Sequence, residues 1–205
     1  MHVKICGLRS PEEAAACAQL GVSSIGLNFV PGSPRCVDVS TARRIADAVR
    51  EVSPRVVLVA VVADMAVEDM RALVQAAGLD CLQLHGDEPP EVLTPLLPHA
   101  YKALRIGGAE DVARARLYPG EHLLVDAKVA GALAGTGTAF ECTLVRDLAR
   151  ERRLTLAGGL TPESVAEAIR VVRPYCVDVA SGVEHAPGVK DLGRVRAFLA
   201  AAREA

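Results

Sequence analysis

The sequence predicts a single α/β domain, residues 1–205, that folds as a (β/α)8 TIM barrel. Short runs rich in β-branched residues alternate with segments of helical periodicity along the chain, which is the pattern of parallel β/α units. One run, residues 56–62, is continuously apolar, as expected of a strand buried on both faces. The pattern predicts eight strands and eight helices, which fill the 205 residues and leave no material for a second domain. Of these residues, 51% are apolar, which is enough for a sizeable core.

The predicted elements follow one another through short connections. Strands are expected at residues 3–6, 24–29, 56–62, 81–84, 101–104, 122–126, 154–157 and 176–180. Helices are expected at residues 11–20, around 42–49, at 67–77, 89–97, 109–116, 140–150 and 162–172, and from about 191 onward. Ser10, Pro11 and Glu13 supply an N-cap, a first-turn proline and a capping-box glutamate, and Gly78 suits the position after the third helix.

A doubly wound open sheet is the alternative fold with the same alternation. Its only nucleotide-binding clue is Gly135-Thr136-Gly137, and the third glycine and the acidic residue about 20 positions further on are both missing. The barrel is therefore the predicted fold, and its binding site is expected in the loops that follow the strands.

The composition excludes several classes of function. The formal net charge is -2, aromatic residues make up 3% and Trp is absent, so neither nucleic acid nor an anionic membrane is an expected partner. No apolar run approaches the roughly 20 residues that span a bilayer. A strand pattern that starts at His2 leaves no room for a signal peptide, so a cytoplasmic location is expected.

The six cysteines are spread along the chain without a CxxC pair, which predicts reduced thiols rather than a disulfide framework. Cys81 and His85 are four residues apart, but no second pair of ligands lies near them in the sequence. No metal site is therefore expected.

Two loops carry glycine where a barrel of this kind commonly binds phosphate. Gly158 and Gly159 follow the seventh strand, and Ser181 and Gly182 follow the eighth. Backbone N–H groups can approach an anion there without a Cβ in the way. One glycine loop alone is often only a turn, but the two together predict a phosphate site.

Two aspartates lie on otherwise apolar strands. Asp126 ends the sixth strand and is either part of an ion pair with Lys128 or Lys4, or a general acid with a raised pKa. Asp178 allows the same two interpretations. Its position inside the eighth strand, on the same face as Ala180, favours a structural or orienting role.

Arg35 closes the stiff loop Pro31-Gly32-Ser33-Pro34-Arg35 after the second strand. It is either a solvated surface arginine or a fork that grips a substrate carboxylate, and the residues leave both interpretations open.

Cys6 ends the first strand, immediately before Gly7. A free cysteine in an apolar strand is usually inert core, but Lys4 lies two residues earlier on the same face. A nearby cation lowers a thiol pKa, so we hypothesise that Lys4 assists Cys6 as a base. Alternatively, Lys4 serves only an ion pair with Asp126 or Asp178.

Together these motifs resemble the phosphoribosylanthranilate isomerase family of tryptophan biosynthesis. The resemblance runs from end to end, and it rests on Lys4-Ile-Cys-Gly-Leu8, Ser33-Pro-Arg35, Gln83-Leu-His-Gly-Asp-Glu88, Leu124-Val-Asp-Ala-Lys128, Gly135-Thr-Gly137, Ala157-Gly-Gly-Leu-Thr-Pro162, Val177-Asp178, Ser181-Gly-Val-Glu184 and Pro187-Gly-Val-Lys-Asp-Leu192.

The resemblance implies an Amadori rearrangement of N-(5'-phosphoribosyl)anthranilate to 1-(2-carboxyphenylamino)-1-deoxyribulose 5-phosphate, without cofactor or metal. The sequence leaves both a homodimer and a monomer open. Asp126 would protonate the furanose ring oxygen so that the ring opens to a Schiff base, and Cys6 would remove the C2′ proton. Arg35 would hold the anthranilate carboxylate, and Asp178 would contact the amino group or orient its neighbours. The remaining assignments are Lys4, Gln83, His85, Gly135, Thr136 and Gly137 at the substrate, and Gly158, Gly159, Ser181 and Gly182 at the phosphate.

Some residues depart from the family pattern. Ala134 stands where a glycine is usual, and Phe140-Glu141-Cys142 where Phe-Asp-Trp is frequent, so the loop expected to close over the substrate is altered. Gly32, Ala180 and His185 replace a common lysine, serine and threonine. None of these changes removes the acid or the base.

Two other functions compete with this one. The histidine-pathway isomerase does the same chemistry, but its barrel resembles a duplicated half with an aspartate base, and Cys6 and the lack of an internal repeat argue against it. A non-catalytic paralogue that binds a phosphorylated ligand predicts loss of the acid or the base, and both are present.

Overall fold

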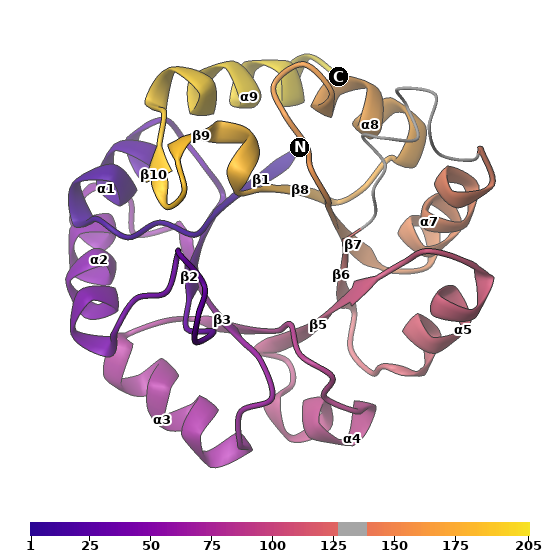
Figure 1. Cartoon of the computed structure of the whole chain (residues 1–205), viewed down its shortest axis with the longest axis horizontal. Coiled ribbons are helices and arrows are strands. Elements are labelled where there is room, and N and C mark those ends of the chain that lie inside the picture. The colour runs from indigo at the N-terminus through magenta and orange to yellow at the C-terminus, as the bar shows by residue number, and fades with distance from the viewer. Residues whose placement is uncertain (127–138) are drawn as a thin grey trace.

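A closed barrel of eight parallel strands forms the centre of the molecule (Figure 1), as the computed structural model shows for residues 1–126 and 139–205. Each strand pairs with its sequence neighbour, and β8 closes the ring against β1. The predicted fold class is therefore confirmed. The strands are β1 (His2–Cys6), β2 (Ser24–Asn28), β3 (Val57–Val62), β4 (Cys81–Leu84), β5 (Ala100–Arg105), β6 (His122–Asp126), β7 (Arg153–Ala157) and β8 (Cys176–Val179).

Helices surround the ring of strands on its outside (Figure 1). Ser10 caps the first of them, since its hydroxyl oxygen accepts a hydrogen bond from the Glu13 N–H, and Gly78 ends the third in the left-handed conformation, both as predicted. The helices are α1 (Pro11–Gln19), α2 (Val39–Val52), α3 (Val67–Ala77), α4 (Pro90–Leu93) with the 3-10 turn η1 (Thr94–Leu96), α5 (Ala109–Leu117), α7 (Ala139–Glu151), α8 (Val165–Val172) and α9 (Leu192–Glu204).

Most boundaries differ from the prediction by one or a few residues, and three of the differences bear on how the loops are built. β8 ends at Val179 rather than at residue 180, so Asp178 lies inside the strand as predicted but one residue from its end instead of two. The fourth helix is a single α turn followed by a 3-10 turn, because Pro95 lacks the N–H that a longer α-helix needs. Helix α8 begins at Val165 rather than 162, because residues 161–164 form a turn in which the Thr161 N–H donates to the Ser164 hydroxyl at 3.0 Å.

The main apolar core lies between the strands and the helices, whereas the interior of the barrel is partly polar. A small apolar cluster of Val59, Tyr101, Ala103 and Leu124 fills part of that interior. Buried polar and charged groups of the strands include Lys4, Gln83, Lys102, Thr155 and Asp178. A buried charge requires a partner, so the ion pairs of the interior determine how the site is built.

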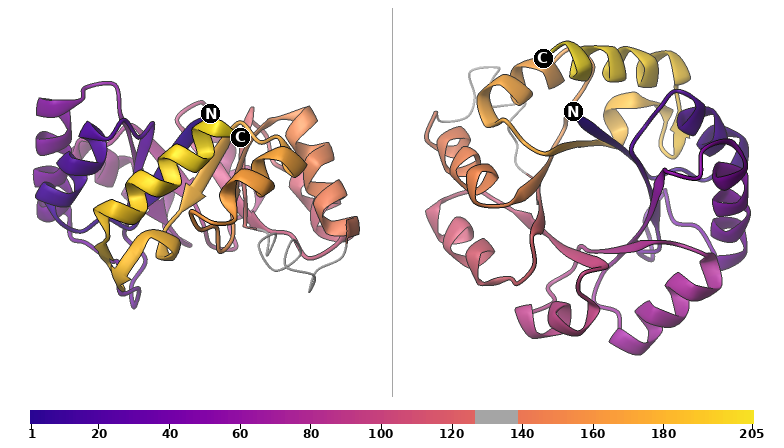
Figure 2. Two further views of the ribbon diagram at one scale, coloured as in Figure 1. Left: turned by 90° about the horizontal axis from the view of Figure 1, so that it is seen from above. Right: turned by 180° about the vertical axis from the view of Figure 1, so that it is seen from behind.

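A two-stranded hairpin follows β8 and was not predicted. After the 3-10 turn η2 (Ser181–Val183), β9 (Glu184–Ala186) pairs antiparallel with β10 (Val189–Lys190). The hairpin lies at the end of the barrel opposite to the chain termini (Figure 2, left). It therefore stands at the end where the C-terminal ends of the strands meet.

Within the two described ranges, no helix has both the length and the apolar character needed to cross a bilayer.

Candidate functional site

A cavity of about 490 Å³ opens at the C-terminal ends of the strands. Lys4 lies buried on β1 and does not line it, and Gly135, Thr136 and Gly137 lie outside the described residues. The cavity brings together the following predicted site residues: Cys6, Arg35, Gln83, His85, Asp126, Gly158, Gly159, Asp178, Ser181 and Gly182.

A larger cavity of about 750 Å³ opens at the opposite end of the barrel. Its lining includes His2, His122, Arg153 and Tyr175 from the starts of four strands or their flanking residues. Cys6 and Asp126 do not line it. Barrel enzymes carry their chemistry at the C-terminal ends of the strands, so the smaller cavity is the candidate active site.

Gly26 on β2 makes room for the two functional side chains of β1. It is the register partner of Cys6. A Cβ at this position would lie 2.7 Å from the Cys6 Sγ and 3.1 Å from the Lys4 Nζ. Any side chain on Gly26 would therefore displace the thiol or the lysine.

Lys4 and Asp178 form a buried ion pair between the first and the last strand. The Lys4 Nζ lies 2.9 Å from the Asp178 Oδ2, and the side chains are 2% and 8% exposed. The other carboxylate oxygen, Oδ1, is buried and has no hydrogen-bond partner among the described residues. Asp178 therefore lines the cavity with one carboxylate oxygen paired to Lys4 and the other without a partner.

Burial raises the pKa of the Cys6 thiol, and this effect outweighs the opposing influence of the Lys4 ammonium. Asp178 also raises the thiol pKa, while Lys190 lowers it. Lys4 therefore favours the thiolate, as hypothesised, but the net pKa of the thiol is raised rather than lowered. The ion pair of Lys4 with Asp178 is also formed, so the ion pair is not the only role of Lys4.

Asp126 ends β6, and Cys6 ends β1. These two strands are not neighbours in the barrel, so the two residues face each other across its opening. The proposed ion pair with Lys4 is wrong, because Lys4 pairs with Asp178. Lys128, the other proposed partner, lies outside the described residues. Within those residues, no ion pair to Asp126 is formed.

A chain of hydrogen bonds fixes the protonation of His85. The Tyr101 hydroxyl donates to the Gln83 Oε1 at 3.0 Å, and the Gln83 amide nitrogen lies 2.9 Å from the His85 Nδ1. An amide nitrogen is a donor, so Nδ1 must accept and the proton of the neutral ring sits on Nε2. Burial lowers the pKa of His85, although Asp126 opposes this, and the neutral form follows. His85 thus offers an N–H donor to the cavity that it lines.

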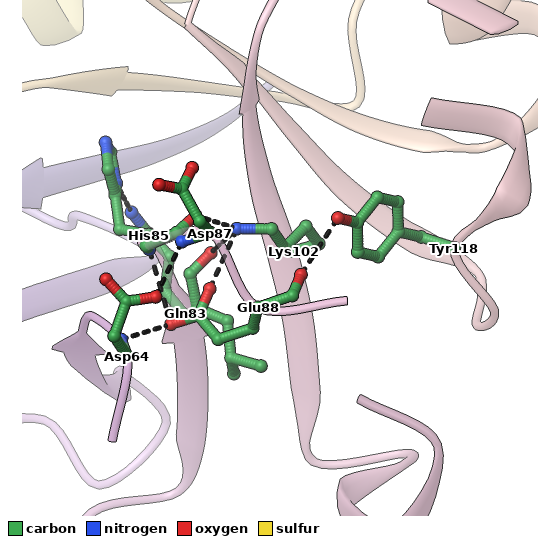
Figure 3. A network of polar contacts seen from close by, with 9 residues as sticks. Asp64, Gln83, His85, Asp87, Glu88, Lys102 and Tyr118 are labelled. Carbon is green, nitrogen blue, oxygen red and sulfur yellow. Dashed lines mark hydrogen bonds and ion pairs between the residues drawn. The ribbon is translucent and has the colours of Figure 1, made fainter. Parts of the chain in front are cut away.

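A second buried ion pair shapes the connection that carries His85 (Figure 3). The Lys102 Nζ contacts the Glu88 Oε2 at 2.9 Å and the Gly86 carbonyl at 2.6 Å, and both charged side chains are almost fully buried. The Glu88 Oε1 accepts hydrogen bonds from the Asp64 and Gly86 N–H groups. Glu88 therefore links the turn after β4 to Lys102 of β5 through an ion pair and to the residue Asp64, which follows β3, through a hydrogen bond.

Arg35 lines the cavity with its guanidinium already bound on one side. Its Nε and Nη2 donate to the two carboxylate oxygens of Glu184 at 2.8 and 2.6 Å. The Lys190 Nζ lies 2.7 Å from the same carboxylate. Arg35 is therefore not a freely solvated arginine, because Glu184 holds its guanidinium in a fixed orientation.

The two glycine loops contribute in different ways. Gly158 and Gly159 have φ angles of 110° and 68°, in the region that favours glycine, and a Cβ on Gly159 would meet nothing within 4 Å. A Cβ on Gly182 would instead collide with the Leu160 carbonyl. Gly182 thus allows the loops after β7 and β8 to pack together.

The sequence reasoning missed five residues that build the site. The resemblance motifs included three of them, but nothing local in the sequence indicated which partner each would meet. These residues are Gly26, Glu88, Lys102, Glu184 and Lys190.

The family model described as N-(5'phosphoribosyl)anthranilate (PRA) isomerase matches residues 3–201. A relative named N-(5'-phosphoribosyl)anthranilate isomerase, from Myxococcus xanthus, is 45% identical and covers 99% of this chain and 96% of its own length. One of the same name from Pseudomonas aeruginosa is 43% identical over 99% and 95%.

Solved structures agree over the whole chain. The crystal structure of phosphoribosyl anthranilate isomerase from Thermotoga maritima has a TM-score of 0.87 at 34% identity, with 100% of both chains covered. A phosphoribosyl anthranilate isomerase in complex with reduced 1-(o-carboxyphenylamino)-1-deoxyribulose 5-phosphate has a TM-score of 0.84 at 33% identity and the same coverage. Monomers derived from the dimeric Thermotoga maritima protein have a TM-score of 0.83 at 34% identity, also over 100% of both chains.

Proposed function

Because the chain belongs to the N-(5'-phosphoribosyl)anthranilate isomerase family, we propose that Cys6 and Asp126 are the base and the acid of that isomerisation. The observation that carries the proposal is that both residues line one cavity from non-adjacent strands, β1 and β6. An acid and a base on opposite sides of one sugar are what the rearrangement of an aminoaldose to an aminoketose requires.

The proton transfers follow from this arrangement. Asp126, as the carboxylic acid, donates its proton to the furanose ring oxygen as the C1′–O bond breaks, and the nitrogen lone pair completes a Schiff base. The Cys6 thiolate then removes the C2′ proton, and the electron pair released forms the enolamine. A proton moves from the C2′ hydroxyl to C1′ as the enolamine becomes the ketone.

The remaining cavity residues hold the substrate in this proposal. Arg35 binds the anthranilate carboxylate, and the N–H groups of the two glycine loops bind the phosphate. Asp178 accepts a hydrogen bond from the substrate amino group, as the resemblance implies. The lack of a partner for its Oδ1 among the described residues supports this role. The His85 Nε2–H is a further donor toward the acid or the sugar.

A direct test generates N-(5'-phosphoribosyl)anthranilate in situ and follows the loss of its fluorescence. General acid–base catalysis contributes about 10²–10⁴-fold, so Cys6→Ser and Asp126→Asn are each expected to lower kcat by at least about a hundredfold. Cys36→Ser and Asp69→Asn make the same chemical changes outside the acid–base pair and should retain activity. Full activity in either site variant would refute its assigned role, and no turnover by the parent would refute the function.

Assembly and location stay predictions. Sedimentation velocity distinguishes the homodimer from the monomer, and fractionation of the source cells tests the cytoplasmic location.

A further inference from the structure

The hairpin β9–β10 holds two charged residues opposite each other. Lys190 is the register partner of Glu184, and Gly188, with φ at 81°, forms the turn between the two strands. Most other side chains of the hairpin are exposed, whereas those of Glu184 and Lys190 are 5% and 0% exposed. The buried side chains of the hairpin are therefore those of the Glu184–Lys190 ion pair.

The turn of the hairpin docks on the loop that carries Arg35. A Cβ on Gly188 would lie 3.1 Å from the Pro34 carbonyl oxygen. Gly7 also packs so closely on the stem of Arg35 that a Cβ on Gly7 would collide with it. The arginine side chain is consequently held along its length and at its head.

The cluster of Arg35, Glu184 and Lys190 has one more positive than negative charge, and this excess charge is available to a ligand. Glu184 is ionised, since hydrogen bonds from Arg35 and Lys190 bring its pKa to about 2 although burial alone would raise it. Arg35 and Lys190 carry two positive charges against one carboxylate. A second N–H of Lys190 donates to the Ala180 carbonyl at 3.0 Å, and the Lys190 side chain is fully buried, so Arg35 is the cation of this pair that can face a ligand.

The geometry of the guanidinium indicates which ligand group fits. A guanidinium has five N–H donors in a planar fork. Glu184 takes Nε and one hydrogen of Nη2, and within the described residues no hydrogen bond is formed by Nη1. The remaining edge, Nη1 with Nη2, matches the two oxygens of a second carboxylate. That edge belongs to a residue that lines the cavity with Cys6 and Asp126.

We propose that Glu184 and Lys190 are positioning residues that aim Arg35 and thereby make the site selective for a substrate with an aryl carboxylate. The proposal rests on the proposed function, because the carboxylate in question is that of the anthranilate ring. Glu184 fixes the plane of the guanidinium, and Lys190 anchors Glu184 to the end of β8.

The test compares two substrates that differ only in this group. N-(5'-phosphoribosyl)anthranilate and N-(5'-phosphoribosyl)aniline, each prepared by condensation of the amine with ribose 5-phosphate, are assayed by chromatography of the products. In Glu184→Gln we expect KM for the carboxylated substrate to rise about tenfold or more, the scale of one charge-assisted hydrogen bond, with kcat changed far less. The kcat/KM for the aniline compound should stay within about twofold, so the selectivity collapses.

Further variants separate positioning from folding. Arg35→Met should lose the same selectivity, and Glu184→Gln added to Arg35→Met should change it no further, because both act through one contact. If Glu184→Gln unfolds because Lys190 is left unpaired, Glu184→Gln with Lys190→Met removes both buried charges and is expected to lose the same selectivity. Glu151→Gln breaks a similar Arg–Glu fork with Arg116 on the outer surface and should leave the selectivity at the parent value.

Equal losses with both substrates in the Glu184 variants would overturn the proposal, since a merely structural role lowers both. Additive effects of the Arg35 and Glu184 substitutions on selectivity would overturn it as well. Failure of the parent to turn over either substrate would instead refute the isomerase function, so the two failures are distinguishable.

Discussion

Cys6 shows how strongly one residue depends on its immediate neighbours. The thiol lies beside a lysine that favours its ionisation, yet burial and Asp178 raise its pKa. At neutral pH the thiol form therefore dominates, and the thiolate that the proposed mechanism needs is the minor species. A sequence pattern can indicate the neighbouring cation, but the balance with burial depends on the packed barrel.

The ionisation of Cys6 can be measured through its rate of alkylation, resolved by mass spectrometry of the peptide. In the parent, the midpoint should lie above that of an ordinary cysteine, because the pKa is raised. Lys4→Met should move the midpoint to still higher pH, since the cation that favours the thiolate is lost and Asp178 is left uncompensated. Lys102→Met is the matched control, because Lys102 is equally buried but pairs with Glu88 and is not among the charges that shift the thiol pKa. An unchanged midpoint in Lys4→Met would contradict this account.

At the scale of elements, the connection between β4 and α4 depends on one buried ion pair. Lys102 and Glu88 are both almost fully buried, and each also binds a backbone group of the turn at Gly86. We therefore expect the Lys102–Glu88 pair to affect both the free energy of unfolding and the position of His85. Single and double variants of the pair can separate these two effects.

Lys102→Met should lower the free energy of unfolding by about 3–5 kcal/mol, because it leaves a buried carboxylate unpaired. The double variant Lys102→Met with Glu88→Leu should recover most of that loss, since neither charge remains. Urea unfolding measures both. The double variant should nevertheless stay about tenfold or more below the parent in kcat/KM, because the turn loses the bonds that orient His85. Parent-like activity in a stable double variant would show that the turn needs no such anchor.

At the scale of the whole molecule, stability should depend on pH through His122. Burial, with a smaller contribution from the Lys4 and Arg153 charges, lowers its pKa to about 4. The unfolded chain, with an ordinary histidine pKa near 6.5, then binds a proton before the folded chain does, so stability is full above about pH 6.5 and falls as the pH drops toward 4. The fall attributable to His122 is at most about 3 kcal/mol.

Urea unfolding between pH 7 and pH 4 tests this, with His122→Gln as the comparison. The variant should show a flatter dependence over that interval. The stability contributed by Glu184, whose pKa is lowered to about 2, is lost only as the pH falls from about 4.5 toward 2, so the two windows are nearly separate. Identical slopes for the parent and His122→Gln would contradict the assignment.

The barrel, and most of the residues that line its cavity, could be predicted from the sequence. In a barrel of parallel strands, the residues at the C-terminal ends of all strands meet at the same end of the barrel. That rule placed Cys6, Asp126 and the glycine loops at one mouth, and they line one cavity, but the acid and base roles of Cys6 and Asp126 came from the family resemblance. Contacts such as Arg35 with Glu184 did not, because the two residues are 149 positions apart and many other charges competed as partners. The hairpin that brings them together is too short for its alternation to be read from the sequence.

The pairing of Lys4 with Asp178 has a consequence for synthesis of the chain. Its two members are separated by 174 residues and join the first strand to the last. A ribosome-bound chain therefore exposes Cys6 long before the neighbour that completes its surroundings has emerged from the exit tunnel. A chain that terminates before β8 lacks both the strand that closes the ring and the carboxylate that pairs with Lys4, so we expect such truncated products to have no isomerase activity.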